Sequence, residues 1–154
     1  MSFIAKRASR SHTIHVDAPV GQAFALFDPI AERLWVNGWD PEIVHPPSQE
    51  IAPGTVFLTR APDEPATIWR VESCDRERFY ARYLRITPES RLGDVEVQCR
   101  PVDDQRTAVV VTYSFTALSP EGNQWVERFT EECYRAFIDS WEKEIRRYLS
   151  GRSS

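Results

Sequence analysis

The stretch that decides the fold is SPEGNQWVERFTEECYRAFIDSWEKEIRRYL, residues 119–149. Ser119 is a typical helix N-cap, and Pro120 fits the first helical position, where its missing N–H costs nothing. Apolar side chains then recur every three or four residues, the spacing of one helix face. They are Trp125, Val126, Phe129, Cys133, Ala136, Phe137, Trp141, Ile145 and Tyr148. We therefore predict one continuous helix over Asn123–Leu149, about 40 Å long at about 1.5 Å per residue.

Residues 40–118 supply a surface on which such a helix can pack. Prolines and polar turns divide this region into short stretches rich in Val, Thr and aromatic residues, which is typical of β-strands. The strand-like stretches are Thr55–Arg60, Thr67–Cys74, Arg78–Thr87, Arg91–Arg100 and Thr107–Leu118. Short turns favour an antiparallel sheet, because parallel neighbours need long crossovers. We expect the C-terminal helix to lie across this sheet.

The N-terminal part adds a strand and two short helices. The stretch His12–Asp17 alternates polar and apolar residues, as a strand with one buried face does. Pro19 and Pro29 each fit the first turn of a short helix. We expect residues 1–10 to form a flexible arm and residues 11–150 to form a single domain.

Composition narrows the class of protein. A chain of 154 residues and 17.8 kDa is the size of one domain. Its net charge of -4 and pI of about 5.4 argue against nucleic acid as a partner, because phosphate binding relies on clustered Lys and Arg. The sequence has neither the run of about 18 apolar residues that a membrane span needs nor an apolar signal peptide. We therefore expect a cytoplasmic protein without stable membrane insertion.

Motifs for metal, cofactor and nucleophilic chemistry are missing from the sequence. The three cysteines are widely spaced with no CxxC pair, so we expect free thiols. His12 and His15 would face opposite sides of a strand and could not share a metal ion. The sequence contains no GxSxG, Walker loop or GxGxxG motif. We expect no metal and no cofactor, and no catalytic residue is identified.

Four stretches resemble the START-related SRPBCC superfamily, which includes the polyketide cyclase/dehydrase and lipid-transport group. They are HTIHVDAPV (residues 12–20), FDPIAERLWVNGWDPEIV (27–44), PGTVFLTR (53–60) and SFTALSPEGNQWVERFTEECYRAFIDSWEKEI (114–145). The second stretch is similar to one bacterial subgroup to which no reaction is assigned. The resemblance covers about residues 11–149.

The resemblance implies an α+β helix-grip fold. In this fold a curved antiparallel sheet of about seven strands wraps around a long C-terminal helix, with two short helices after the first strand. A cavity between sheet and helix would take apolar or amphipathic small molecules. The superfamily has no shared catalytic motif, so the resemblance speaks for the fold more than for a reaction.

Two tryptophans near the second short helix are candidates for the cavity wall. Trp35 and Trp39 could form its mouth, with Glu32 or Asp40 as a polar anchor. Alternatively, the tryptophans clamp the short helices onto the sheet while Glu32 pairs with a nearby arginine.

Arginines within strand-like runs are the candidates for a polar anchor. Residues two apart share a strand face, so Arg82 shares a face with Tyr80 and Leu84, whereas Arg85 shares one with Phe79, Ala81 and Tyr83. Without a bulge, one of these arginines points toward the helix and needs a carboxylate or an anionic ligand. The alternative is a solvated ladder of Arg with Glu72 and Glu96. The full set expected to contact a ligand is Trp35, Trp39, Arg60, Trp69, Arg82, Tyr113, Phe129, Cys133 and Phe137.

Three functions remain open on this basis. The first is binding or transport of a small apolar, aromatic or lipid-like molecule in the internal cavity. The second is a polyketide cyclase/dehydratase-like enzyme that uses a buried acid, Tyr or Arg in the same cavity. The third is an interaction module like the chaperone-activator branch of the superfamily, working through its outer face. We expect a monomer or homodimer, and the sequence leaves open whether any reaction is catalysed.

Overall fold

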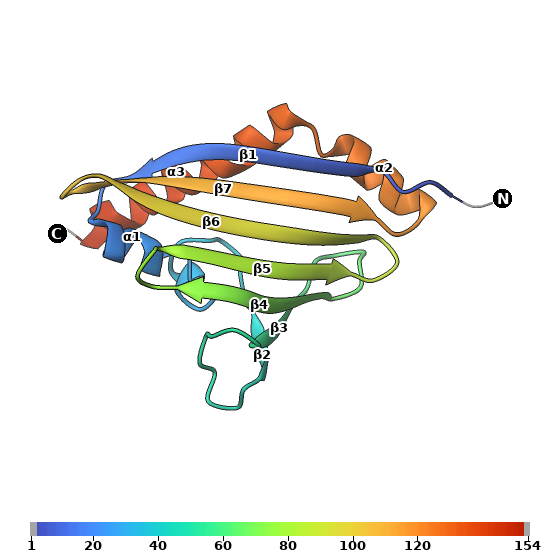
Figure 1. Ribbon diagram of the computed structural model, residues 1–154, viewed down its shortest axis with the longest axis horizontal. Helices are drawn as coiled ribbons and strands as arrows, with labels where there is room; N and C mark the ends of the chain where they lie inside the picture. The colour runs from blue at the N-terminus through green and yellow to red at the C-terminus, as the bar shows by residue number, and fades with distance from the viewer. Residues whose placement is uncertain (1–2, 153–154) are drawn as a thin grey trace.

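One curved antiparallel sheet dominates the computed structural model, which describes residues 3–152 (Figure 1). Its seven strands have the spatial order β1-β7-β6-β5-β4-β3-β2. The strands are β1 (Arg7–Val16), β2 (Glu42–His45), β3 (Val56–Thr59), β4 (Thr67–Asp75), β5 (Tyr80–Thr87), β6 (Arg91–Asp103) and β7 (Arg106–Ala117). The helices are α1 (Val20–Ala25), the 3₁₀-helix η1 (Ala31–Leu34), α2 (Pro120–Arg128) and α3 (Glu131–Arg152). The predicted helix-grip α+β fold, with two short helices after the first strand, is therefore confirmed.

Alternating burial gives the sheet one apolar, concave face. Along β7 and residues 91–99 of β6 every second residue is buried, including Val95, Val97, Val109 and Val111. Because successive side chains of a strand point to opposite faces, these residues all face the helices, and the intervening polar residues face solvent. The sheet therefore presents a single apolar surface, on which α2 packs against β7 and α3 against β1.

The C-terminal helix is broken in two, so the prediction of one continuous helix is wrong in this respect. Phe129 ends α2 with φ -81° and ψ 66°, which is not a helical conformation. Thr130 then caps α3, its hydroxyl accepting a hydrogen bond from the Cys133 N–H at 3.2 Å. The aromatic side chains on both sides of the break still pack together. Trp125 and Phe129 stack on each other, with ring centres 5.6 Å apart and an interplanar angle of 17°, and both contact Phe115. Periodicity alone did not reveal this break.

The first strand begins earlier than predicted. Residues 7–10 of the expected flexible arm belong to β1, where Arg7 pairs with Thr116 and Arg10 with Tyr113. The length of β7 gives these residues a partner, and hydroxyl pairs such as Ser9–Ser114 at 2.9 Å extend the contact. Residues 1 and 2 of the predicted arm lie outside the described residues.

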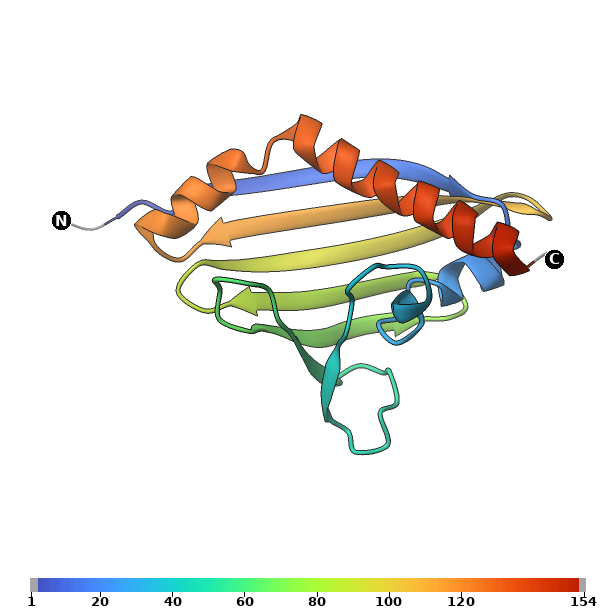
Figure 2. The same cartoon turned by 180° about the vertical axis from the view of Figure 1, so that it is seen from behind.

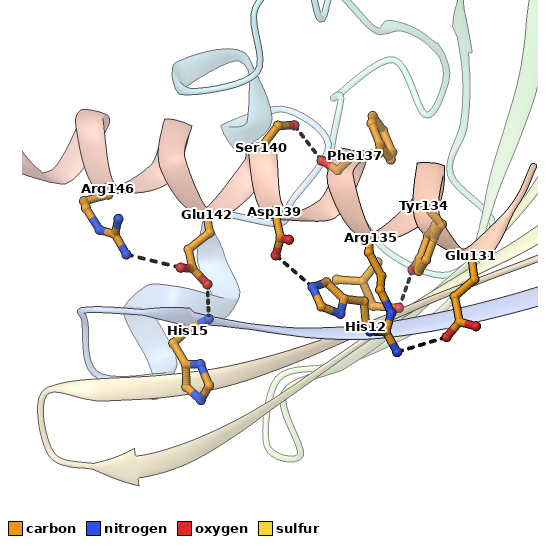
Figure 3. Close-up of polar contacts among 11 residues, drawn as sticks. His12, His15, Glu131, Tyr134, Arg135, Phe137, Asp139, Ser140, Glu142 and Arg146 are labelled. Carbon is orange, nitrogen blue, oxygen red and sulfur yellow. Dashed lines mark hydrogen bonds and ion pairs between the residues drawn. The ribbon is translucent and has the colours of Figure 1, made fainter.

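Polar contacts fix α3 over the β1 edge of the sheet (Figures 2 and 3). The His12 Nε2 atom lies 2.8 Å from Asp139 Oδ1, and the His15 backbone N–H donates to Glu142 Oε2 at 2.9 Å. Below the helix, the Tyr134 hydroxyl donates to the Val111 carbonyl. Because α3 lies along the β1 edge, the η1 segment and the loops next to β2 and β3, rather than α3, lie over β4 and β5 in Figure 2. Within the described range, no helix combines the length and apolarity of a membrane span.

Candidate ligand-binding site

A single row of side chains crosses the concave face from β3 to β7. Strand register aligns Phe57, Trp69, Arg85, Gly93 and Phe115 in that order. A Cβ on Gly93 would lie 2.6 Å from Phe115 Cδ1, so the missing side chain makes room for the Phe115 ring. As a result, the Arg85 Cζ atom lies 4.5 Å from the Trp69 ring centre and 5.5 Å from that of Phe115. The row places a cation between aromatic rings under the helices.

A cavity of about 140 Å³, which we call the inner cavity, lies between this row, α3 and the η1 segment. Its walls are mainly aromatic and aliphatic. It is lined by Pro29, Glu32, Val36, Trp39, Phe57, Trp69, Tyr83, Arg85, Val95, Val97, Tyr113, Phe137 and Trp141. Trp69 stacks on Phe57 at 5.4 Å and meets Trp39 edge-on at 5.8 Å. These rings build a rigid apolar wall that helps to shape the cavity.

Two further hollows adjoin the inner cavity. The hinge cavity, of about 380 Å³, lies beneath the break between α2 and α3 and shares Tyr113 and Phe137 with the inner cavity. Its lining is Arg85, Tyr113, Phe115, Trp125, Arg128, Phe129, Cys133, Tyr134 and Phe137. The polar groove, of about 810 Å³, is an open, charged depression beside β2 and β3 that shares Trp39 with the inner cavity. Arg85 lines all three hollows and therefore lies where they meet.

Arg85 is the cation of this site, and it has no hydrogen-bond or ion-pair partner in the part of the chain that the structure describes. Its Nε is buried, and the side chain makes no hydrogen bond or ion pair with any residue in the range 3–152. Burial lowers the pKa of its guanidinium, and the charge of Arg91 also lowers it, while Tyr113 and the Glu64 carboxylate act in the opposite direction. Arg91, in contrast, has a counter-charge. Its Nη1 atom lies 2.8 Å from Glu64 Oε1, and its Cζ atom lies 3.8 Å from the Trp125 ring centre.

Glu32 is the acid of the inner cavity. It is carried by η1, and its carboxyl group has no hydrogen-bond partner among residues 3–152, although water retains partial access to the residue. Burial raises the pKa of Glu32 well above its ordinary value, and the nearby carboxylate of Asp28 raises it further. The Tyr113 hydroxyl also lines this cavity, and burial raises its pKa. The cavity therefore contains a proton donor and a cation within an apolar wall.

The raised pKa of Glu32 predicts a pH-dependent effect on stability. A carboxyl group whose pKa is higher in the folded than in the unfolded state costs stability as pH rises from about 4.3, its unfolded pKa, through the folded value. We expect Glu32→Gln to be more stable than the wild type at pH 8 and to lose this advantage toward pH 4. Each unit of raised pKa corresponds to about 1.4 kcal/mol.

Urea unfolding at pH 4, 6 and 8 measures this difference. The exposed Glu77→Gln is the matched control and should show no such trend. A stability difference between Glu32→Gln and the wild type that is the same at all three pH values would contradict the prediction.

Six of the residues expected from the sequence line the two apolar cavities. Trp39, Trp69, Tyr113 and Phe137 line the inner cavity. Phe129 and the exposed Cys133 line the hinge cavity. These six come from β4, β7, the α2–α3 region and the loop after η1, so only tertiary packing brings them together.

Three expected residues lie elsewhere. Trp35 belongs to the core, where its Nε1 donates to the Leu26 carbonyl at 2.7 Å, and it lines none of the three hollows. Arg82 faces the outer surface of the sheet, pairing with Asp94 at 3.2 Å. The Arg60 side chain is 70% exposed at the rim of the polar groove. The expectation that Trp35 and Arg82 line the ligand cavity is therefore wrong, and Arg60 lies outside its apolar part.

Arg85 takes the place that Arg82 was expected to have. The two positions differ by an odd number, so on one strand they face opposite sides. The buried residues Ala81 and Tyr83 share the Arg85 face, and this alternation was the available signal in the sequence. Glu32 also remains without the arginine partner that was considered for it, because Arg33 pairs with Asp40 instead.

Comparison with known proteins supports the fold. No protein-family model and no curated protein sequence matches the chain. Among solved structures, norcoclaurine synthase from Thalictrum flavum, a point mutant with a transition-state analogue, has 15% identity and a TM-score of 0.65, covering 96% of this chain and 99% of that one. The ZhuI aromatase/cyclase from Streptomyces sp. R1128 has 18% identity and a TM-score of 0.67, with coverages of 94% and 96%. An uncharacterised protein from Rhizobium leguminosarum has 17% identity and a TM-score of 0.67, with coverages of 94% and 97%.

At these identities the likeness concerns the fold, over nearly the full length of both chains. The same curved sheet and long C-terminal helix carry different activities in these structures, so the fold alone assigns none of them. The chain therefore shares the helix-grip fold of these structures.

Proposed function

We propose that the protein binds a small aromatic or amphipathic molecule in the inner cavity and the adjoining hinge cavity. The observation that carries this proposal is the open volume, about 140 and 380 Å³, left between aromatic walls under α3. A cavity of about 150 Å³ lined by apolar side chains is large enough for a benzene ring. Affinity would come mainly from apolar burial, at roughly 25 cal/mol per Å².

The structural neighbours support a ligand of this kind. One structure of norcoclaurine synthase, similar to this chain at 16% identity and a TM-score of 0.63, contains dopamine and hydroxybenzaldehyde. That protein therefore holds aromatic rings within the same fold. The stacked wall of Trp69 and Phe57 offers this chain a comparable apolar surface.

Filling the inner cavity tests the proposal. N-phenyl-1-naphthylamine is a neutral probe whose fluorescence rises in apolar surroundings. We expect the wild type to bind it and Val97→Phe to weaken binding at least tenfold, because Val97 lines the inner cavity and the added ring would occupy it. Fluorescence titration measures both affinities.

Val102→Phe is the matched control, since it makes the same change at an exposed position of β6. It should bind the probe like the wild type. A wild type that does not bind the probe, or a Val97→Phe variant that binds it unchanged, would overturn the proposed function.

An acid–base enzyme is the second candidate, favoured by one observation. Glu32 and Arg85 line the same cavity, and burial raises the pKa of the Glu32 carboxyl group and lowers the pKa of the Arg85 guanidinium, which remains a cation. Ionisable groups with shifted pKa values in a cavity are typical of sites that transfer protons. In such an enzyme Glu32 would be the proton donor, and Glu32→Gln would abolish turnover while retaining ligand affinity.

A further inference from the structure

The charges around the polar groove leave one cation unbalanced. Four arginines line this groove, and three of them are paired with carboxylates. The pairs are Arg33–Asp40 at 3.5 Å, Arg60–Glu42 at 3.2 Å and Arg91–Glu64 at 2.8 Å. Arg85 is the fourth, and no carboxylate in residues 3–152 pairs with it. Each acid on the groove already has an arginine, so none remains for Arg85.

Arg85 also differs from the other three groove arginines in its position, because they do not line the inner or hinge cavity. Arg85 extends from the centre of the sheet into the place where the inner cavity, the hinge cavity and the polar groove meet. The Arg85 side chain is partly buried, and its Nε is buried without an acceptor, which is unfavourable unless a partner supplies hydrogen-bond acceptors. Because no residue in 3–152 forms a hydrogen bond or ion pair with the Arg85 side chain, the position is suited to an anionic group of a ligand.

Neighbouring rings define how an anion can reach this guanidinium. Trp69 and Phe115 lie on either side of Arg85 along the row, 4.5 and 5.5 Å from its Cζ atom. Rings on both sides leave the N–H edge as the direction of approach. A carboxylate is planar and accepts two parallel hydrogen bonds from that edge. A carboxylate therefore matches this position in both charge and shape.

Tyr113 supplies a second polar contact at the same place. It lines the inner and hinge cavities together with Arg85, and its hydroxyl has no hydrogen-bond partner within residues 3–152. The hydroxyl could donate to a carboxylate oxygen. Glu32, on η1, lines the same cavity but forms no hydrogen bond or ion pair with Arg85.

We propose that the ligand is an aromatic carboxylate, bound with its carboxylate on the N–H edge of Arg85 and its ring system in the inner and hinge cavities. This inference rests on the proposed function, because it requires the apolar cavities to hold a ligand. It adds that the ligand carries a single negative charge, which balances the unpaired arginine.

A matched pair of ligands tests the charge requirement in the unaltered protein. 2-Naphthoate and 2-naphthamide have the same ring system and nearly the same shape, but only the first is an anion. We expect isothermal titration calorimetry at pH 7 to show that 2-naphthoate binds the wild type at least tenfold more tightly. Equal affinities, or no binding of 2-naphthoate by a protein that binds N-phenyl-1-naphthylamine, would overturn the inference and leave the proposed function standing.

Two variants test whether the preference for 2-naphthoate depends on Arg85. Arg85→Met should remove the preference for 2-naphthoate while retaining N-phenyl-1-naphthylamine, which also reports that the cavity is intact. Arg82→Met is the matched control on the same strand, facing outward with Asp94, and should keep the full preference. A preference that survives in a folded Arg85→Met variant would overturn the assignment to Arg85.

Discussion

Replacing Gly122 with alanine is expected to lower the free energy of unfolding by about 3 kcal/mol or more. Gly122 lies in the first turn of α2, where its N–H donates to the Ser119 cap at 3.0 Å. A Cβ at this position would lie 1.9 Å from the Ser90 carbonyl oxygen. That oxygen already accepts the Leu118 N–H at 2.8 Å, so it cannot move without loss of a hydrogen bond. The extra methyl group would therefore force α2 away from the turn between β5 and β6.

Urea unfolding followed by circular dichroism measures this loss. Gly21→Ala is the matched control, because Gly21 also lies in a helix but has no heavy atom within 4 Å of the added Cβ. We expect the control to gain about 0.4–1 kcal/mol, since alanine reduces the entropy of the unfolded chain. Equal stability of Gly122→Ala and the wild type would show that the contact with Ser90 relaxes freely.

Ile138→Ala is expected to destabilise the protein by about 2–5 kcal/mol, whereas the adjacent Phe137→Ala should cost about 1 kcal/mol or less. Ile138 is 0% exposed and Phe137 is 48% exposed, although both lie on α3. The helix turns Ile138 into the core and places Phe137 at the boundary of the inner and hinge cavities, away from β1 (Figure 3). Truncating the first leaves a void in the core, and truncating the second removes part of the ligand wall.

Urea unfolding and ligand titration together distinguish the role of Phe137 in binding from the role of Ile138 in stability. Phe137→Ala should weaken binding of N-phenyl-1-naphthylamine while the variant unfolds near the wild-type midpoint. Ile138→Ala should show the large loss of stability. The reverse pattern, with Phe137 controlling stability, would mean that the α3 face assigned to the cavity belongs to the core.

The break between α2 and α3 connects the fold to the cavity. Because α2 packs on β7 and α3 turns onto β1, neither helix fills the space under the break. The rings of Trp125 and Phe129 remain with Phe115, forming one side of the hinge cavity. A single straight helix would not have opened the hinge cavity in this way.

Local sequence patterns were sufficient to predict the architecture. The spacing from Trp125 to Ile145, the cap at Ser119 and the short turns between strand-like stretches predict a helix over an antiparallel sheet, and the structure confirms this. These signals are local because helix periodicity, capping and turns depend on residues close together in the chain. The aromatic candidates Trp39, Trp69 and Tyr113 were likewise visible as large side chains within elements of the expected sheet and loop.

The details of the site depended on contacts between distant parts of the chain. Sequence alternation placed Arg82 and Arg85 on opposite faces, but only the pairing of β5 with β4 and β6 decided which face is concave. The break at Phe129 depended on packing against Phe115, and the unpaired state of Glu32 depended on where η1 meets the sheet. Sequence periodicity thus determined which elements form, whereas register and packing across the sheet decided that Arg85 lies unpaired in the cavity, because those interactions join residues that no local pattern relates.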